Sequence, residues 1–481
     1  MMGSKSYECC IIGAGPAGLG AALELVKHGV SNILIIERNK IVGGLARTEV
    51  YDGARFDIGP HRFFTKSKKI NKIWHDTLGE DFRSVSRLTR ISYRNQYISY
   101  PIKLYEVLAS LGPMELLKAM FSFILAQADK KKQAITFEDW TIQKFGRKLY
   151  ETFFKAYTEK VWGIACNQIS AEWASQRIKG LDVLQVLKNS LLGAQNNKIR
   201  TLAKQFDYPL LGAGQMYQAI SDQVASRGVE VMLNTKVVSI NCQDSTVASV
   251  DIVNSDNEKI NIAAKQFFSS IPLAHFFNML NSSESASIKK SVEAVQYRGH
   301  ITVNLLVGGK KLFPDQWIYL PSPDIQMARL ASYNNFSEAM AGGKNKTALS
   351  AEYFAFRNKG LWNESDQSLK NLAIAELKSM DLVKRSAVEN SWVVREAQAY
   401  PVNYVGFQEH YDILKSRMDQ FANLYSIGRA GTHKYNNQDH SIMSGILAAH
   451  NYLRLPGSPY SLWDINTNDE YYESAMRDTT L

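Results

Sequence analysis

Hydrophobic positions near the start of the chain follow the periods of strand, helix and strand in turn. An apolar run from Cys9 to Ile12 predicts a buried strand, and a segment with helical spacing continues to about His28. A second apolar run, Ile33 to Ile36, predicts another buried strand. Because two buried strands joined by a helix form a parallel βαβ unit, this stretch predicts the beginning of a Rossmann-like α/β domain.

The periodicity changes again further along the chain. Helical spacing dominates between residues 104 and 204, which predicts an inserted helical bundle. The segment from Met114 to Leu125 is apolar enough for contact with a membrane surface, but packing inside this insert is the interpretation we favour. From about residue 271 to 414, strand patterns with connecting helices predict a second, mostly antiparallel sheet.

Three glycines separate the first predicted strand from the helix. Gly13 allows a tight turn, Gly15 lets the backbone approach a pyrophosphate, and Gly18 lets helix and strand pack closely. The helix N-terminus offers unpaired N–H groups to the phosphates. Glu37 ends the second strand, where a carboxylate accepts hydrogen bonds from a ribose hydroxyl. The motif and its context together predict a dinucleotide-binding site.

A second glycine turn, Gly43-Gly44, follows soon after Glu37. The chain then gives a short stretch from Arg55 to His61, where a nicotinamide domain would continue into further βα units. This order resembles flavoproteins of the glutathione-reductase and amine-oxidase type, in which such a turn lies along the FAD diphosphate. FAD is therefore the expected cofactor, and an ordinary glycine-rich loop is the alternative.

The changes of period, together with this cofactor, predict a domain organisation. The expected ranges are 1–103, 205–270 and 415–455 for three parts of an FAD-binding domain, 104–204 for an inserted helical substrate or lid domain, 271–414 for a substrate-binding sheet domain, and 456–481 for a tail.

Composition limits the remaining possibilities. A chain of 481 residues suits two or three domains. No window of about 18 uninterrupted apolar residues occurs, so no transmembrane segment is expected. The four cysteines show no CxxC or other metal-ligand spacing, and the sequence begins without a signal-peptide pattern. We expect a cytoplasmic protein without disulfides or bound metal.

The net charge of +10 fits an anionic cofactor and an anionic substrate, and it equally fits a solvated lysine surface. The run Lys130-Lys131-Lys132 is too short to indicate nucleic-acid binding, so no nucleic-acid partner is expected. A small-molecule substrate is the expected partner. NAD(P)H or a reductase is a candidate electron source, and homo-oligomerisation stays open.

Four further segments carry a resemblance over most of the chain. They are Gly59-Pro60-His61, Tyr157 to Gly163 (YTEKVWG), Tyr400-Pro401-Val402, and Gly428 to Ser441. Together with the glycine motifs they resemble the UDP-galactopyranose mutase branch of the flavin amine-oxidase superfamily. The resemblance implies a redox-neutral pyranose–furanose isomerisation of a nucleotide sugar, with reduced FAD as the nucleophile.

The resemblance also implies site residues. His61, Arg177 and Arg329 would be catalytic, with His61 beside the flavin and the two arginines on the substrate diphosphate. Trp162, Arg177, Arg329, Tyr400 and Tyr435 would bind substrate, with Trp162 against the base. The residues expected to bind FAD are Gly13, Gly15, Gly18, Glu37, Arg38, Gly44, Leu45, Ala46, His61, Val237, Gly428, Arg429, Asp439, Ser441 and Ile442. Each substrate-site residue also has a structural alternative: a helix cap for Arg177, plain core for Trp162, and packing for the two tyrosines. His61 has the alternative of a turn residue.

The chain departs from the family pattern at two positions, where Lys103 replaces an amide side chain and Asn437 an acid, and no second arginine closely follows Arg177. Three functions remain in view. The first is a pyranose–furanose mutase. The second is an FAD-dependent oxidoreductase of the amine-oxidase or protoporphyrinogen-oxidase type. The third is a flavin-bearing assembly partner without turnover.

Overall fold

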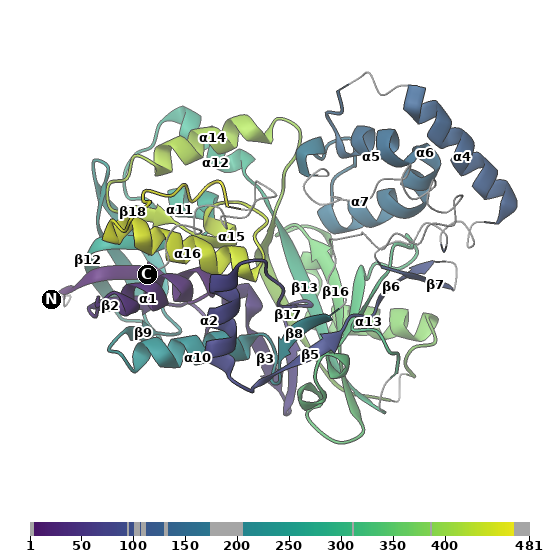
Figure 1. Ribbon diagram of the computed structural model, residues 1–481, viewed down its shortest axis with the longest axis horizontal. Coiled ribbons are helices and arrows are strands. Elements are labelled where there is room, and N and C mark those ends of the chain that lie inside the picture. Colours follow the sequence, from purple (N-terminus) through teal and green to yellow (C-terminus); the bar gives the residue numbers. More distant parts are fainter. Residues whose placement is uncertain are drawn as a thin grey trace.

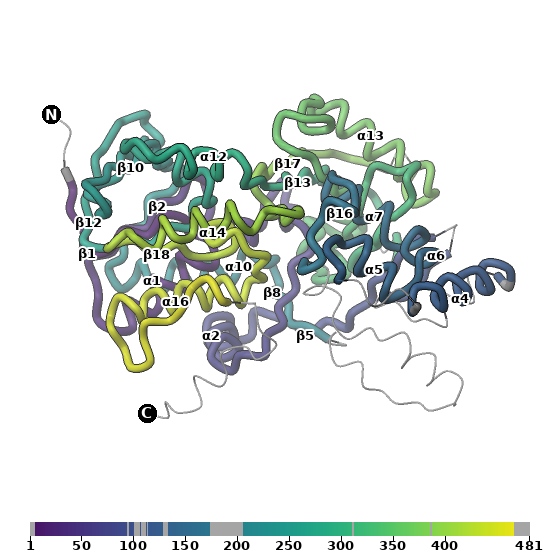
Figure 2. Tube along the Cα trace, turned by 90° about the horizontal axis from the view of Figure 1, so that it is seen from above, coloured from purple at the N-terminus to yellow at the C-terminus, as the bar shows by residue number. Residues whose placement is uncertain are grey.

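The computed structural model describes residues 4–93, 96–100, 106, 112–128, 133–173, 205–309, 312–384 and 387–465. The described chain forms a Rossmann-like domain at one end of the long axis, a second sheet beside it, and a group of helices at the other end (Figures 1 and 2). The predicted fold class is confirmed in all three parts. No described helix is long and apolar enough to cross a membrane.

The Rossmann-like domain is built on a seven-stranded sheet in the order β10-β11-β12-β1-β2-β9, with β18 beside β12. Its central strands are parallel, because β1 pairs in parallel with both β2 and β12. The strands are β1 (Ser4–Ile12), β2 (Ile33–Ile36), β9 (Glu230–Met232), β10 (Lys236–Gln243), β11 (Thr246–Val253), β12 (Lys259–Ser269) and β18 (Leu424–Ser426).

Helices cover both faces of this sheet, which explains why its strands are apolar on both sides. One face packs against α1 (Pro16–Lys27), α10 (Gly214–Ala225) and α16 (Gln438–Leu453), with α2 (Lys68–Leu78) outside them. The other packs against α11 (Leu273–Met279), α12 (Ala286–Ala294) and α14 (Phe407–Met418). The short elements η1 (Gly44–Ala46) and α15 (Gly428–Gly431) lie at the edge where the glycine turns meet.

The second sheet has the order β17-β13-β16-β15-β14-β6-β7 and is antiparallel except where β14 pairs with β6. The helix α13 (Asp366–Ser379) packs against one face. Its strands are β6 (Thr89–Tyr93), β7 (Gln96–Ser99), β13 (Tyr297–Gly308), β14 (Trp317–Tyr319), β15 (Arg329–Ser332), β16 (Lys346–Ala355) and β17 (Val388–Pro401). The hairpin β6–β7 falls within the range 1–103, yet pairing with β14 makes it part of this sheet.

Smaller elements connect these layers. β3 (Thr48–Tyr51) and β4 (Ala54–Asp57) form a hairpin, and β5 (Phe82–Ser86) pairs antiparallel with the distant β8 (Gln205–Pro209). Single 3₁₀ turns are η3 (Tyr333–Asn335), η4 (Glu338–Ala341) and η5 (Gly360–Asn363).

The described part of the insert is helical, as predicted. It contains α4 (Pro113–Ala128), α5 (Phe137–Phe145), α6 (Arg147–Leu149), the π-helical segment η2 (Tyr150–Lys155) and α7 (Ala156–Trp162). Gly146 breaks the helical run with φ of 83°, and a Cβ there would lie 2.8 Å from the Phe123 backbone nitrogen. This glycine lets α5 and α6 turn closely around α4.

The expectation that the segment from Met114 to Leu125 packs inside the insert is wrong for one face of α4. Ala119 and Ala126 are buried, but Leu117 and Phe121 leave 62% and 64% of their surface exposed. Helical periodicity identified the helix correctly. It did not reveal that the described elements of the insert pack against one side of this helix and leave the apolar side chains of the other side exposed.

Candidate functional site

A cavity of about 580 Å³ lies where the Rossmann-like domain meets the second sheet. It begins at the glycine turn and Glu37, continues along η1 and the loop around His61, and ends among residues of β13, β15 and β17. Residues of the C-terminal segment from Gly428 to Ser441 also line it. The fold therefore brings segments that are distant in sequence to one site.

The glycine turn has the geometry that its sequence predicts. Gly13 has φ of +104°, and a Cβ there would lie 2.0 Å from the Ser270 hydroxyl. At Gly18 a Cβ would lie 1.9 Å from the Gly13 carbonyl oxygen, so α1 packs directly on the turn. Gly15 approaches Gly44 closely, with 3.6 Å between its Cβ position and the Gly44 Cα. The two glycine turns thus form one cradle at the N-terminus of α1.

Glu37 is buried and fixed at the end of β2. Its carboxylate accepts hydrogen bonds from the backbone N–H of Ala14 at 2.9 Å and from the side-chain amide of Asn39 at 2.8 Å. Oε1 also accepts from the Asn39 backbone N–H at 2.9 Å, so Oε2, which accepts from Ala14 alone, is the oxygen that keeps a free acceptor site. Glu37 lines the cavity. Its position suits the ribose contact expected for it.

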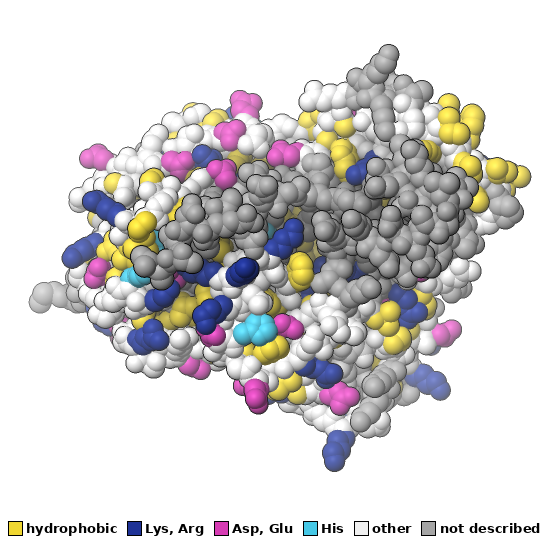
Figure 3. All heavy atoms as spheres, in the orientation of Figure 1, with side chains coloured by type: hydrophobic (Ala, Val, Ile, Leu, Met, Phe, Trp, Pro, Cys, Tyr) yellow, Lys and Arg dark blue, Asp and Glu magenta, His cyan; other side chains and the backbone are white. Residues whose placement is uncertain are grey.

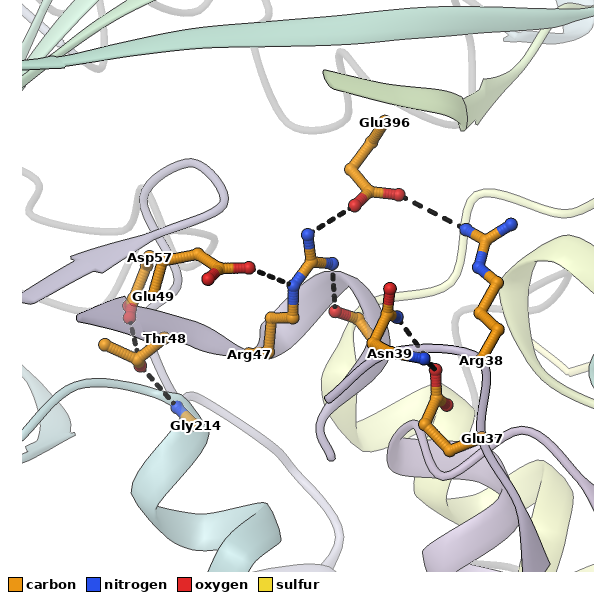
Figure 4. A network of polar contacts seen from close by, with 10 residues as sticks. Glu37, Arg38, Asn39, Arg47, Thr48, Glu49, Asp57, Gly214 and Glu396 are labelled. Carbon is orange, nitrogen blue, oxygen red and sulfur yellow. Dashed lines mark hydrogen bonds and ion pairs between the residues drawn. The ribbon is translucent and has the colours of Figure 1, made fainter. Parts of the chain in front are cut away.

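Buried ion pairs join the second glycine turn to the second sheet (Figure 4). Arg47 donates to Glu49 at 2.7 Å, to the Gly44 carbonyl at 3.0 Å, and to Glu396 on β17. Glu396 also accepts from Arg38 at 3.4 Å. Burial lowers the pKa of Arg47, but the surrounding carboxylates outweigh this and raise it. The Glu396 carboxylate of β17 thus pairs with two arginines, Arg38 and Arg47, at the edge of the Rossmann-like sheet where the glycine turns lie.

A second buried carboxylate fixes the chain just after that turn. Asp57 accepts hydrogen bonds from the Thr48 hydroxyl at 2.6 Å, the Tyr208 hydroxyl at 2.7 Å and the Ala213 N–H at 3.2 Å. The Thr48 hydroxyl accepts from the Gly214 N–H at 2.8 Å (Figure 4). Complete burial raises the pKa of Asp57 to about 7. These contacts tie β3, β4 and the start of α10 together beneath the cavity.

The far half of the cavity contains an arginine, a glutamate and a histidine in contact. Arg329, the first residue of β15, donates to Glu352 Oε2 from Nε at 3.0 Å and from Nη2, and His300 Nε2 lies 2.8 Å from the same oxygen. Glu352 is fully buried. Although burial raises its pKa, the charge of Arg329 and the His300 hydrogen bond keep that pKa below the usual range. Glu352 thereby orients Arg329 toward the cavity.

The loop around His61 lies over this cluster. Gly59 has φ of +86°, which favours glycine, and its Cβ position lies 3.4 Å from the His300 side chain and 3.7 Å from the Arg329 side chain. His61 lines the cavity, and its Nδ1 is shielded from solvent without a hydrogen-bond partner. Burial and the charge of Arg429 lower the pKa of His61 to about 4. The imidazole is therefore neutral at pH 7.

A second guanidinium and two tyrosines complete this end. Arg429 lies over the Tyr435 ring at 3.9 Å and the Tyr400 ring at 4.6 Å, and its Nε donates to the Ala399 carbonyl at 2.8 Å. The Tyr400 hydroxyl accepts from Arg329 at 3.2 Å. Burial lowers the pKa of Arg429 to about 10, which leaves it charged at pH 7. Two cations and two phenols thus line one end of the cavity.

Asn436 adds an unsatisfied amide to the same wall. The residue is 2% exposed and lines the cavity, and neither its Oδ1 nor its Nδ2 has a hydrogen-bond partner. A buried amide without partners is costly, so such a group indicates a polar ligand.

Comparison with known proteins agrees with this geometry. A family model described as "NAD(P)-binding Rossmann-like domain" matches residues 11–77. "Probable UDP-galactopyranose mutase" of Klebsiella pneumoniae is 28% identical over 224 residues, 44% of this chain and 52% of the relative. dTDP-fucopyranose mutase of Escherichia coli is 27% identical over 174 residues, 34% and 43% of the two chains. The chain thus matches about half or less of the length of these curated relatives.

The solved structures supply the whole-chain comparison. A crystal structure of reduced UDP-galactopyranose mutase superposes with a TM-score of 0.81 at 21% identity, covering 96% of each chain. This chain has the fold of UDP-galactopyranose mutase. The resemblance inferred from the short motifs is confirmed, and it extends from the glycine turns through the insert and second sheet.

Most of the expected site residues line the cavity of this mutase fold. They are Gly13, Gly15, Glu37, Arg38, Gly44, Leu45, Ala46, His61, Val237, Arg329, Tyr400, Gly428, Arg429, Tyr435, Asp439 and Ser441. Gly18 and Ile442 do not line it. Gly18 packs α1 on the turn, and the Ile442 backbone lies against Gly20, where it fixes α16 on α1. Arg177 and Lys103 lie outside the described residues.

Trp162 is 4% exposed and does not line the cavity. It ends α7 and packs edge-on against Trp173 at 4.8 Å and Tyr400 at 6.1 Å. Through Tyr400 it contacts the wall of the site, and its neighbours form an apolar cluster that includes Phe137 and Cys166. Trp162 thus packs behind Tyr400, and its contact with a substrate base stays a prediction.

Five residues of the site were not predicted from the sequence: Arg47, His300, Glu352, Glu396 and Asn436. Arg47 follows the Gly43-Gly44 turn directly, so its position in the motif was an available signal. The others lie on ordinary strand patterns or beside a predicted residue. A charged residue within an apolar strand, as at Glu352, is the signal that would have identified one of them.

A cluster outside the cavity has metal-ligating side chains but already contains a cation. Glu24, His28 and His450 bring ligand atoms within 4.8 Å of one another. The Lys69 ammonium lies 3.0 Å from Glu24 Oε1 and 3.4 Å from His450 Nε2. The Lys69 ammonium provides the positive charge that a metal would bring. The cluster therefore joins α1, α2 and α16 through an ion pair and hydrogen bonds.

Proposed function

We propose that the protein is a flavoenzyme that binds FAD in this cavity and interconverts the pyranose and furanose forms of a nucleotide sugar. Two relatives support a nucleotide sugar as the substrate, since one is named as a mutase of a UDP sugar and the other as a mutase of a dTDP sugar. The observation that carries the proposal is the pair of guanidinium groups, Arg329 and Arg429, beside the Tyr400 hydroxyl at one end of the cavity. Such donors suit a diphosphate.

The residues present fit FAD. The cradle formed by Gly13, Gly15 and Gly44 at the N-terminus of α1 suits a diphosphate, and Glu37 suits a ribose. At the other end, His61 Nδ1 and the Asn436 amide are buried polar groups without partners, as expected where a polar ring system binds. A cofactor extended between these ends would leave the two guanidinium groups for the substrate.

When bound in its reduced form, FAD would supply the nucleophile for the anomeric carbon of the sugar. The protein would supply orientation and charge. Arg329 and Arg429 would bind the diphosphate and stabilise its charge as it leaves. Glu352 fixes the direction of Arg329, and the neutral His61 presents an unpaired ring nitrogen without adding charge.

The described cysteines are all free thiols, which supports a reducing, cytoplasmic location.

The direct test uses protein carrying FAD and reduced with dithionite. Incubation with UDP-galactopyranose and dTDP-fucopyranose should yield a furanose product from at least one of them, measured by anion-exchange chromatography, and none with oxidised protein. A lack of furanose across such a panel, together with bleaching of oxidised flavin by an amine or a porphyrinogen, would instead support an oxidoreductase.

The role of the arginines has its own test. Arg329→Ala should weaken binding of the nucleotide diphosphate by roughly 10- to 100-fold while flavin content stays unchanged, because it removes a charge-assisted contact. Arg177→Ala should behave alike, as the family resemblance implies. Arg83→Ala, on the exposed face of β5, is the control. Equal loss of flavin in the variants would show that both arginines are structural.

A further inference from the structure

Backbone carbonyls, instead of water, surround the ammonium group of Lys160. Figure 3 shows Lys and Arg side chains standing out from the described surface, where solvent surrounds their charge. The Lys160 ammonium on α7 instead lies close to the carbonyl oxygens of Leu320 at 2.6 Å, Ser322 at 2.7 Å, Ile325 at 2.5 Å and Met327 at 3.3 Å. Among the described residues, no carboxylate forms an ion pair with it. One cation therefore gathers four carbonyls.

These carbonyls belong to the chain between β14 and β15, residues 320–328, which we call the β14–β15 segment. It forms neither helix nor strand, so its peptide groups lack the regular partners of a ladder. Glu376 of α13 holds the same segment by its N–H groups, because its carboxylate accepts from Gln326 and, at 3.1 Å, from Met327. The segment is thus fixed by a cation from α7 and a carboxylate from α13.

The β14–β15 segment leads directly into the candidate site. Arg329 follows it as the first residue of β15 and lines the cavity. Ala328, the last residue of the segment, is buried in one cluster with Val161 of α7, and its N–H donates to the Glu352 carbonyl at 2.9 Å. The Glu352 carboxylate sets the direction of the Arg329 guanidinium, and the segment sets the point from which that side chain starts. A shift of the segment would therefore move the guanidinium.

The helix α7 is a fixed base for Lys160. Arg298 of β13 donates to two carbonyls at the end of α7, from Nε at 3.0 Å and from Nη2 at 3.3 Å. Tyr157, three residues before Lys160, packs edge-on against Tyr319 at 5.5 Å. Tyr319 ends β14 and is the register partner of Arg329. The helix thus contacts the second sheet on both sides of the β14–β15 segment.

We propose that Lys160 is a positioning residue for the diphosphate site. By holding the β14–β15 segment on α7, it places the Arg329 guanidinium where the substrate diphosphate binds. Lys160 does not line the cavity, so it acts through Arg329. This role rests on the proposed function, because it requires that Arg329 bind a nucleotide diphosphate. A lysine that only stabilised the fold would affect binding whether or not Arg329 was present.

The test is a double-mutant cycle on the full-length, FAD-loaded protein, with UDP and dTDP as the ligands in calorimetric titrations. Lys160→Met removes the charge and keeps an apolar stem, and it should weaken nucleotide binding roughly tenfold. In the Arg329→Ala background the same change should weaken binding by less than about twofold, because the residue through which Lys160 acts is absent. Lys155→Met, at an exposed position of η2, is the control in both backgrounds.

Two further measurements separate positioning from folding. Glu376→Gln loosens the same segment through its N–H groups, so it should show the same coupling to Arg329 even if Lys160→Met fails to fold. Propylammonium replaces the atoms that Lys160→Ala removes. It should restore nucleotide binding to that variant, whereas the neutral 1-propanol should not, since the carbonyls need a cation.

Each outcome bears on the proposal. Equal weakening with and without Arg329, or no weakening by either the Lys160 or the Glu376 change, would overturn the positioning role. Equal restoration by propylammonium and 1-propanol would overturn it as well. A wild type that binds neither UDP nor dTDP would overturn the proposed function itself, and this outcome is distinct because it is measured before any variant is compared.

Discussion

At the scale of single residues, Asn436 is the most informative position of the site. Its buried amide has no partner among the described residues, and its neighbour Asn437 caps α16. An amide presents one donor and one acceptor group together, which complements the alternating carbonyl and N–H groups at the edge of a flavin ring. The Asn436 amide is therefore available to a polar ligand in the cavity.

We predict that Asn436→Leu weakens FAD binding by roughly tenfold, because the ligand loses hydrogen bonds in a buried site. The same change should leave the FAD-free protein as stable or more stable, since an unsatisfied amide is replaced by an apolar group of similar size. Thermal shift with and without FAD measures both effects. Asn71→Leu, on the exposed surface of α2, is the control. A variant that loses stability equally in both forms would show that Asn436 is structural.

At the scale of elements, a single carboxylate joins three helices. Glu24 of α1 is 3% exposed and contacts His450 of α16 at 2.8 Å and Lys69 of α2 at 3.0 Å. His28 and Lys27 face it from its own helix at 3.6 and 4.0 Å. Burial raises the pKa of Glu24, but its partners outweigh this and lower it to about 2. The contact holds α2 and α16 against α1, whose N-terminus carries the cradle.

This shift predicts a dependence of stability on pH. The pKa of Glu24 is lower in the folded state than in the unfolded chain, so its stabilisation is full above about pH 4.5 and is lost as pH falls toward 2. Glu24→Gln should cost roughly 3 kcal/mol of unfolding free energy at pH 7 and flatten the decline between pH 5 and 3. Urea unfolding across this range, with the exposed Glu80→Gln as control, measures both. An unchanged slope would contradict the assignment.

At the scale of the whole molecule, a few buried charges fix the three parts relative to one another. Glu396 of the second sheet holds Arg47 and Arg38 of the dinucleotide-binding edge. The Lys160 ammonium of α7 lies within 3.3 Å of four backbone carbonyls of the segment 320–327, among which its three N–H groups are shared. Burial lowers the pKa of Lys160 to about 8. These contacts join the elements that form the walls of the cavity.

We predict that Glu396→Gln lowers flavin content and the unfolding temperature together. Removing one member of a buried ion pair costs about 3–5 kcal/mol, and here it leaves the Arg47 guanidinium beside the cofactor cradle without one of its carboxylates. Glu389→Gln, an exposed ion-paired position on the same strand, is the matched control. Flavin absorbance per protein and a thermal melt measure the effect. Normal flavin content in the Glu396 variant would show that the cradle is independent of the second sheet.

The sequence by itself determined the local structure and the nature of the cofactor site. One βαβ unit contains the glycines at 13, 15 and 18 and the acid at 37. Their roles could be predicted from the sequence because the turn and the helix that position them are formed by residues close together in the chain. Periodicity likewise identified the insert as helical and the second sheet as mostly antiparallel, because one buried face imposes a period on each element.

The tertiary structure decided which elements share a surface, and periodicity carries no such information. It placed Trp162 behind the cavity wall, left one face of α4 uncovered, and attached the hairpin β6–β7 to the second sheet. It also brought Glu352 and Glu396 to the site, although each lies hundreds of residues from the glycine turns. Contacts of that sequence separation depend on how whole layers pack, so only the assembled fold specifies them.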